Sequence, residues 1–312
     1  MSEKCRVCEK PAVRNLGTYS FCEEHYKAAT RQRSWLWPAD LTTLLLSIAF
    51  VLVAFGLDRW LQPSFSSLTL IVLGIIMSFI PAGLWLAMFY RRDRYEPEPK
   101  VLVIQVFALG GLMAWGIGDR VLNILFDVDN WLYANWWTQL AGGILVVGFT
   151  QEFLKYLAVR ASVYRLQEFD ERTDGIIYGT AVGLGYATAL NIDLIVASGG
   201  IDLGTAAFRI AITALAHASF SGVMGYFLAR EKFEQNPIWW MPLGLTLAAV
   251  LNGAFYYLRG LIAIGQITST GGSSNPWTGL FLAAGFAILL TWSLSKLIQQ
   301  DVATAMATKE KK

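Results

Sequence analysis

Long uncharged apolar runs recur along the chain, separated by short polar segments. A helix needs about 20 apolar residues to cross roughly 30 Å of hydrocarbon. Eight runs approach or exceed that length, so the pattern predicts an all-α polytopic membrane protein with about eight transmembrane helices. The predicted spans are Leu41–Leu57, Leu68–Tyr90, Val101–Gly118, Trp136–Val159, Gly175–Ser198, Thr205–Ala229, Ile238–Leu258 and Trp277–Ile298.

The region around the third run needs a closer reading. The polar stretch Arg91–Lys100 before it has two prolines and alternating charges, which predict a loop. The run itself, Val101–Gly118, is short and rich in glycine. The segment Val121–Trp137 after it carries tryptophans and a tyrosine, residues typical of the membrane–water interface. We therefore expect Val121–Trp137 to form a separate interfacial helix.

Composition supports the membrane assignment. Of the 312 residues, 15% are charged and 55% are hydrophobic, whereas soluble domains average about 25% and about 45–50%. The net charge is only +2, and the basic residues are dispersed along the chain. Because nucleic-acid binding relies on concentrated positive charge, no nucleic-acid partner is expected. The lipid bilayer is the expected environment.

Charge distribution also predicts orientation and domain limits. If the eight spans alternate, 21 of the 25 lysines and arginines lie in or beside the segments that share a side with the N-terminus. The positive-inside rule then places both termini in the cytoplasm. The expected organisation is a small head over residues 1–34, a transmembrane domain over 35–300 and a charged cytoplasmic tail over 301–312.

The head contains the pattern Cys5-x2-Cys8-x13-Cys22-x2-His25, which uses every cysteine of the chain. Two close ligand pairs separated by a loop are what tetrahedral zinc requires. We expect Tyr19–Phe21 to form part of a hairpin between the pairs. Four protein ligands leave no open position, so the predicted zinc is structural rather than catalytic. The alternative is three incidental thiols and a surface histidine.

Ionisable residues inside the predicted spans are rare and are functional candidates, because a charge in hydrocarbon is costly. Glu152 and Lys155 lie one helical turn apart on the same helix face. His217 is the only histidine outside the head. The other polar candidates within the spans are Asn191, Asp193 and Asn252.

Several of these side chains can reach one another. Counted at about 1.5 Å per residue from the cytoplasmic ends, Glu152, His217, Asn252 and Asn191 can meet in one polar chamber. A carboxylate and an imidazole together can activate water and protonate a leaving amine, or hold a divalent metal. The alternative is an interfacial Glu152–Lys155 pair with a snorkelling lysine. A proton-coupled transporter is a third option, although no internal repeat stands out.

Four segments resemble the PrsW-type glutamic intramembrane proteases, relatives of the CAAX-processing protease superfamily. The resemblance covers about residues 90–257 and implies a peptidase that cuts membrane-protein or single-span peptide substrates within the bilayer. It implies Glu152, Lys155 and His217 as the catalytic group. The matching segments are the basic, Glu-Pro-containing Arg92–Lys100, the Glu-Glu-x-x-Lys-like Gln151–Lys155, the Gly-rich Asp174–Gly185 and the histidine segment His217–Ser221.

The chain departs from the family pattern at three places. Gln151 replaces the first glutamate of the pair, Leu190 replaces the glutamate of Phe-x-x-x-Glu, and Asn252 replaces the histidine of a later His-Gly. Glutamine cannot take a proton from water, and leucine neither ionises nor binds metal. General-base loss typically costs about 10²- to 10⁴-fold in rate.

Two functions therefore stand side by side. In the first, Glu152 is the base of an intramembrane protease, His217 is its acid or electrostatic partner, and Asn191 or Asn252 contacts the oxyanion. In the second, the protein is a catalytically degenerate homologue that binds or scaffolds membrane segments in regulation. The sequence leaves open whether the membrane chamber also holds a divalent metal.

Overall fold

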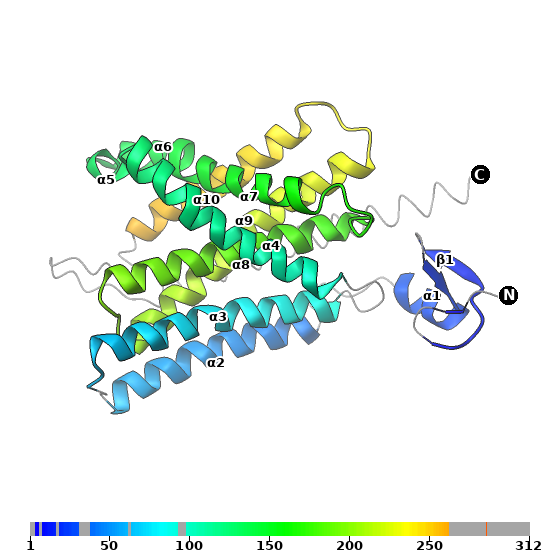
Figure 1. Ribbon diagram of the computed structural model, residues 1–312, viewed down its shortest axis with the longest axis horizontal. Coiled ribbons are helices and arrows are strands. Elements are labelled where there is room, and N and C mark those ends of the chain that lie inside the picture. Colours follow the sequence, from blue (N-terminus) through cyan, green and yellow to red (C-terminus); the bar gives the residue numbers. More distant parts are fainter. Residues whose placement is uncertain are drawn as a thin grey trace.

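The computed structural model describes residues 4–5, 8–16, 19–30, 38–61, 64–92, 98–261 and 285. Within these residues the chain is almost entirely helical, and one short hairpin near the N-terminus supplies the strands. Figure 1 shows a bundle of long helices together with a small N-terminal head. The all-α class predicted for the apolar region is confirmed.

The head consists of strands β1 (Arg14–Leu16) and β2 (Tyr19–Phe21) followed by helix α1 (Glu23–Thr30). The strands pair antiparallel, as expected for a hairpin between the two ligand pairs. Phe21 is fully buried and packs with Cys5 and Cys22. So small a core is weak by itself, because short domains normally need a metal or disulfide to hold them together.

Six helical segments of the described chain are long and apolar enough to cross a bilayer, which makes this an integral multi-pass membrane protein. They correspond to the first six spans expected from the sequence. Their bounds are Thr42–Leu61, Ser67–Met88, Lys100–Leu125, Trp136–Ser162, Arg172–Ala197 and Leu203–Phe233. The helices that form the first two are α2 (Pro38–Leu61) and α3 (Ser67–Arg92).

The third span is longer than predicted, and the separate interfacial helix over Val121–Trp137 is wrong. Helix α4 (Lys100–Met113) continues through the π-helical segments η1 (Ala114–Gly118) and η2 (Arg120–Leu125). Two short helices follow, α5 (Val128–Trp131) and α6 (Trp136–Gly142). Neither glycine nor Asp119 stops a helix whose backbone hydrogen bonds can widen to the π pattern.

Helices α8 (Arg172–Ala197) and α9 (Leu203–Phe233) form the centre of the bundle, with α4 against α8 and α10 (Trp240–Leu261) against α9 (Figure 1). Glycines allow the contact between α8 and α9. A Cβ at Gly183 would lie 2.5 Å from the carbonyl oxygen of His217, and one at Gly179 would lie 2.5 Å from that of Ser221. These glycines therefore allow close packing of the two helices.

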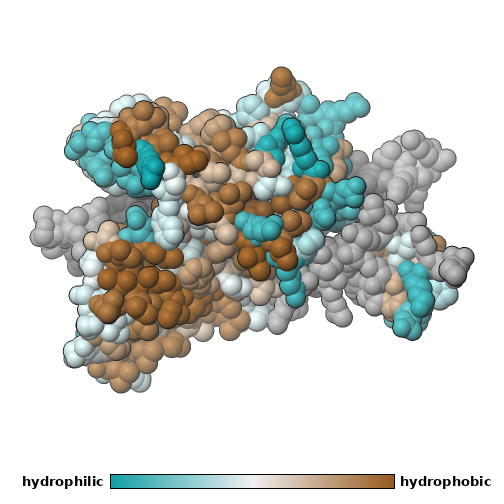
Figure 2. All heavy atoms as spheres, viewed as in Figure 1, coloured by the Kyte–Doolittle hydropathy of each residue, from teal (hydrophilic) through white to brown (hydrophobic). Residues whose placement is uncertain are grey.

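Burial separates central from peripheral helices. In the most apolar window of α9, 94% of the residues are buried inside the protein, against 17% for α2. Large apolar side chains of α2 and α3, such as Leu52 and Ile76, are exposed. Figure 2 shows the resulting broad hydrophobic surface over α2 and α3. Such a surface requires lipid contact, because a soluble monomer rarely exposes one of this extent.

The two remaining predicted spans have different outcomes. Ile238–Leu258 corresponds to α10, which is 22 residues long but is not among the six segments apolar enough to be assigned as spans. The eighth, Trp277–Ile298, lies outside the described residues, and the count of eight stays a prediction.

Candidate functional site

The densest polar cluster inside the membrane domain lies where α9 and α10 meet α7 (Phe149–Ser162). Glu152, Lys155 and Ser221 are completely buried, and His217 is 7% exposed. Asn252 and Gln151 are also buried at its edge. The three residues on α7 are separated from the others by at least 62 positions in sequence, so only the tertiary fold assembles the cluster.

Lys155 is at the centre of the cluster. Its Nζ lies 2.7 Å from Glu152 Oε1 and 2.8 Å from His217 Nδ1. A lysine ammonium has only donors, so both neighbouring atoms accept from it. The alternative of an interfacial pair with Lys155 extended toward water is wrong, because the Lys155 side chain is completely buried.

Glu152 receives two further hydrogen bonds. Asn252 Nδ2 donates to Oε1 of Glu152 over 2.8 Å and to Oε1 of Gln151 over 3.0 Å. The Ser221 hydroxyl donates to the other carboxylate oxygen, Oε2, over 3.3 Å. A buried carboxylate with this many donors is held in one orientation.

Close helix contacts explain why Asn252 reaches α7. A π-helical segment, η3 (Gly143–Gly148), leads directly into α7. A Cβ at Gly253 would lie within 2.5 Å of the backbone of η3, and one at Gly148 would overlap the carbonyl oxygen of Ala249. Glycine on both sides therefore brings α10 into backbone contact with η3, directly before α7. The side chain of Asn252 then reaches the Glu152 carboxylate.

Tyr186 completes the surroundings of Lys155 and His217. Its ring stacks on the His217 imidazole with centroids 5.8 Å apart, and Lys155 Nζ lies 5.0 Å from the ring centre. The sequence analysis did not select Tyr186 or Ser221 as site residues. Their signal was weak: Tyr186 takes the place of an apolar phenylalanine in the family pattern, and Ser221 stands one helical turn from His217.

The other polar residues predicted for the chamber lie elsewhere. Asn191 is buried, but its Nδ2 has no hydrogen-bond partner among the described residues. Asp193 is exposed on the same helix. Leu190 packs with an apolar group that includes Leu154 and Tyr186. The structure thus joins Gln151, Glu152, Lys155, His217 and Asn252 by hydrogen bonds, and no bond in the described chain connects Asn191 to them.

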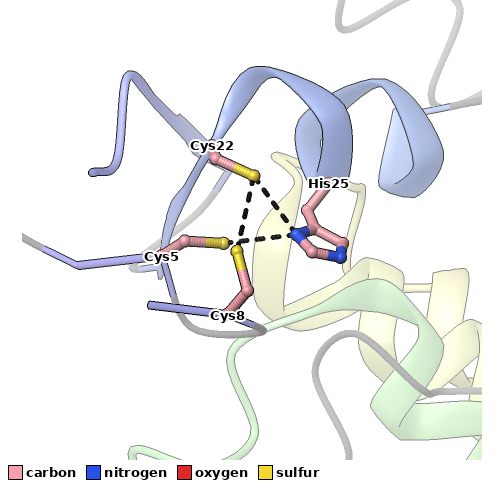
Figure 3. A group of neighbouring side chains, drawn as sticks. All are labelled: Cys5, Cys8, Cys22 and His25. Atoms are coloured by element: carbon pink, nitrogen blue, oxygen red, sulfur yellow. Dashed lines mark hydrogen bonds between the residues drawn. The ribbon is translucent and has the colours of Figure 1, made fainter. Parts of the chain in front are cut away.

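A second cluster lies in the head, where the four expected ligands point toward one another (Figure 3). Their ligand atoms lie within 4.8 Å of one another. Cys8 Sγ and Cys22 Sγ are 3.8 Å apart, and Cys22 Sγ is 3.2 Å from His25 Nδ1. Sulfur ligands around tetrahedral zinc, with Zn–S bonds of about 2.3 Å, stand about 3.8 Å apart. The described head can therefore hold a metal ion.

A third polar group lies at the end of the bundle where α4 and α8 begin. Glu98 is buried and accepts a hydrogen bond from the Tyr178 hydroxyl, and it shares another with Asp174. Asp174 also accepts from the backbone N–H groups of Asp170 and Glu171. Burial raises the pKa of Glu98, and the neighbouring charge of Asp170 adds to that effect.

Taken together, the fold and the buried Glu152–Lys155–His217 cluster define a multi-pass membrane protein with a buried polar cluster inside its helices. Residues 98–290 match the model of the PrsW family intramembrane metalloproteases. The chain belongs to this family, and the resemblance stated from its sequence motifs is confirmed.

Characterised relatives agree with this assignment. Protease PrsW of Bacillus subtilis strain 168 is 30% identical over 192 residues, covering 59% of this chain and 82% of the relative. Protease PrsW of Geobacillus kaustophilus strain HTA426 is 32% identical over 189 residues, with 59% and 80% covered. Protease PrsW of Clostridioides difficile strain 630 is 26% identical over 187 residues, with 59% and 77% covered. No solved structure matches the chain.

The family description includes a metal, and the donor set of the buried cluster does not fit one. Among the described residues, only the head gathers three or more histidine, cysteine or carboxylate ligands around a common point. In the membrane cluster, Glu152 and His217 are the two ligands of that kind, and the Lys155 ammonium lies between them. A cationic side chain in that position competes directly with a metal ion.

Proposed function

We propose that the protein hydrolyses peptide bonds of membrane-protein substrates within the bilayer, with Glu152 as the general base. The contact that carries this proposal is Glu152 with Lys155 and, through Lys155, with His217. These are the acceptor, the charge partner and the imidazole that proton transfer requires, buried together away from lipid. The family membership supplies the reaction class.

In the proposed reaction, Glu152 removes a proton from water while the water oxygen attacks the scissile carbonyl carbon. The resulting oxyanion takes over one of the two N–H groups of Asn252 Nδ2, which before the reaction donate to Glu152 and Gln151. When the C–N bond breaks, its electrons pass to the nitrogen. That nitrogen takes a proton through the Lys155–His217 pair, and the proton held by Glu152 restores the pair. The products are a carboxylate-terminated and an amine-terminated fragment.

A second candidate function is a catalytically degenerate homologue that binds or scaffolds transmembrane segments. Its support is the composition of the cluster: Gln151, Leu190 and Asn252 stand where the family pattern has two glutamates and a histidine. Asn252 and Gln151 are bonded to each other, so both amides already have partners without a substrate. Binding of a membrane segment needs neither a base nor an acid.

Co-expression with candidate single-span substrates separates the two functions. The wild-type protein is compared with Glu152→Gln and His217→Ala, and Asp129→Asn, an exposed carboxylate of α5, serves as the matched control. The protease proposal expects cleavage by the wild type and the control, with a loss of about 100-fold or more in the two site variants. Cleavage that survives both site substitutions eliminates this site. If the wild type captures the substrate without cleaving it, and Gln151→Glu/Leu190→Glu gains cleavage, the result supports a catalytically degenerate homologue.

We further propose that the head binds structural zinc through Cys5, Cys8, Cys22 and His25. The support is the convergence of four ligand atoms within 4.8 Å. The head lies outside the residues matched by the family model, 98–290. We therefore propose the head, residues 1–34, as a separate unit from the transmembrane domain, residues 35–300, and the tail, residues 301–312.

We also propose that both termini lie in the cytoplasm. Besides the distribution of basic residues, ion pairs support a shared membrane side for several predicted inner segments. Arg160 at the end of α7 pairs with Glu231 at the end of α9 over 2.5 Å, and Arg172 at the start of α8 pairs with Glu234 over 3.1 Å. The C-terminal ends of α7 and α9 and the start of α8 therefore meet at one end of the bundle.

A further inference from the structure

We propose that Lys155 takes the place of a metal cation in the membrane site, so that this member of the family works without a metal in its helices. This inference rests on the proposed function for its catalytic consequences, but not for the metal content it predicts. Lys155 is assigned here as a positioning residue, because it acts on substrate through Glu152 and His217.

The lysine nitrogen lies where a metal ion would have to bind. Lys155 Nζ lies 2.7 Å from Glu152 Oε1 and 2.8 Å from His217 Nδ1. Those are the two atoms a metal would take as ligands, at about 2.0–2.2 Å. Both distances match ordinary N–H hydrogen bonds instead. The third side of the ammonium faces the Tyr186 ring, 5.0 Å from its centre, so the cation is enclosed by an anion, an imidazole and an aromatic face.

The remaining neighbours are donors rather than ligands. A carboxylate accepts hydrogen bonds only, so the Asn252 atom that contacts Glu152 must be the amide nitrogen, which does not ligate a metal. Gln151 offers one amide oxygen, which already accepts from the same Asn252 nitrogen. Ser221 donates to the second oxygen of Glu152. Each described polar contact of the carboxylate is thus satisfied by a donor hydrogen.

The charges of the cluster also argue against a bound metal ion. Glu152 and Lys155 are both completely buried, and together they carry no net charge. A divalent ion added between them would leave two uncompensated positive charges in a low-dielectric interior, where an unpaired charge costs several kcal/mol. In the head, three cysteine sulfurs and an imidazole converge instead, which is a donor set that binds zinc with release of the thiol protons.

Metal counting on the full-length protein in detergent tests the inference. We expect about one zinc per chain in the wild type and none in Cys5→Ser/Cys22→Ser, which removes two head ligands. Adding Glu152→Gln to that head variant is then expected to leave the metal content unchanged. A head variant that retains one metal per chain, lost on adding Glu152→Gln, overturns the inference. No metal in the wild type supports the inference and removes the zinc assignment of the head instead.

Cleavage rates test the inference separately, because rescue by an added amine is not expected if Lys155 has only a structural role. The head variant is expected to keep its cleavage rate within about twofold after chelation, because no metal takes part in proton transfer. Lys155→Ala is expected to lose about 100-fold and to recover part of the rate with added methylammonium. Lys155→Arg, which keeps the charge, is the conservative comparison.

Two outcomes of the cleavage test contradict the inference. One is loss of cleavage on chelation with recovery on adding zinc. The other is a folded Lys155→Ala protein that methylammonium does not rescue, accompanied by an equally deep loss in Lys155→Arg. If the wild type cleaves nothing, the proposed function fails, while the metal count still decides the inference by itself.

Discussion

The head and the buried membrane cluster both gather polar side chains, the head from one short segment and the membrane cluster from distant helices. The two regions balance charge differently. In the head, three cysteines and a histidine converge with their ligand atoms within 4.8 Å. In the membrane, a lysine ammonium lies between the carboxylate and the imidazole. The ligand set of the head can hold an added metal ion, whereas the membrane cluster already contains a cationic side chain.

The difference follows from the size and surroundings of the two regions. The core of the head is little more than Phe21 and the ligand residues, so the free energy of metal binding has to supply its stability. The membrane cluster is enclosed by packed helices, where an unmatched charge is costly but a matched pair is tolerated. A small domain is therefore stabilised by ligands that can bind an added metal ion. A packed interior is instead stabilised by charged side chains that neutralise one another.

The largest expected effect concerns the head. Cys22→Ser removes one of four ligands, and structural zinc typically contributes about 10–16 kcal/mol of binding free energy. We expect the zinc content of the protein to fall toward zero and the head to become sensitive to limited proteolysis, while thermal unfolding of the membrane domain is unchanged. Lys10→Ala, which removes an exposed ion pair with Glu24, is the control. A zinc content equal to that of the wild type rejects the assignment.

The next largest effect concerns the buried Glu152–Lys155 ion pair. Lys155→Met leaves the buried Glu152 carboxylate without its cation and is expected to destabilise the membrane domain by about 3–5 kcal/mol. Thermal unfolding in detergent measures the loss. Lys155→Met/Glu152→Gln removes both charges and is expected to recover part of it. If the losses of the single variants simply add, the two side chains are not coupled and the comparison with the head fails.

A third prediction tests the helix contact that assembles the cluster. Gly183→Ala places a methyl group 2.5 Å from the His217 carbonyl oxygen, and such overpacking costs about 1–3 kcal/mol. The variant is expected to unfold at lower temperature and to lose cleavage, because α9 moves away from α8. Gly83→Ala in α3, which has nothing within 4 Å of its added Cβ, is the matched control. Equal behaviour of the two variants would contradict the packing role.

The smallest effect concerns pH, and it has opposite signs in the two regions. The pKa of Glu98 is raised by burial, so the folded state favours its protonated form. Its contribution to stability is complete below the unfolded pKa and is lost as pH rises through the folded pKa. Zinc binding in the head changes in the other direction, because acid protonates the ligands.

Unfolding temperatures measured between pH 5 and pH 9 should therefore fall with rising pH in the wild type. The fall is expected to be smaller in Glu98→Gln. The difference corresponds to about 1 kcal/mol or less of unfolding free energy for each unit by which the pKa of Glu98 is raised. Glu231→Gln, at the same end of the bundle, serves as the comparison for a general change in charge. An identical pH dependence of the wild type and Glu98→Gln contradicts the role of Glu98.

Sequence patterns determined the membrane class and the first six spans. They also selected the four residues of the head that converge and the buried group of Glu152, Lys155 and His217. Each rests on a local signal: the length of an apolar run, the spacing of a ligand pair, or a charge where hydrocarbon forbids one. The interfacial helix at Val121–Trp137 was wrong, since glycine content does not reveal that a helix continues in π form.

Only the tertiary structure decided how the polar residues of the membrane domain are connected. The sequence treated Lys155 as a charge that could reach water, and the fold buries it between Glu152 and His217. The sequence grouped Asn191 with Asn252, but backbone contact at Gly253 brings only Asn252 to Glu152 within the described chain. The physical reason is that side-chain contacts between helices depend on their approach and rotation. These are set by many packing contacts at once and leave no mark in the spacing of any one segment.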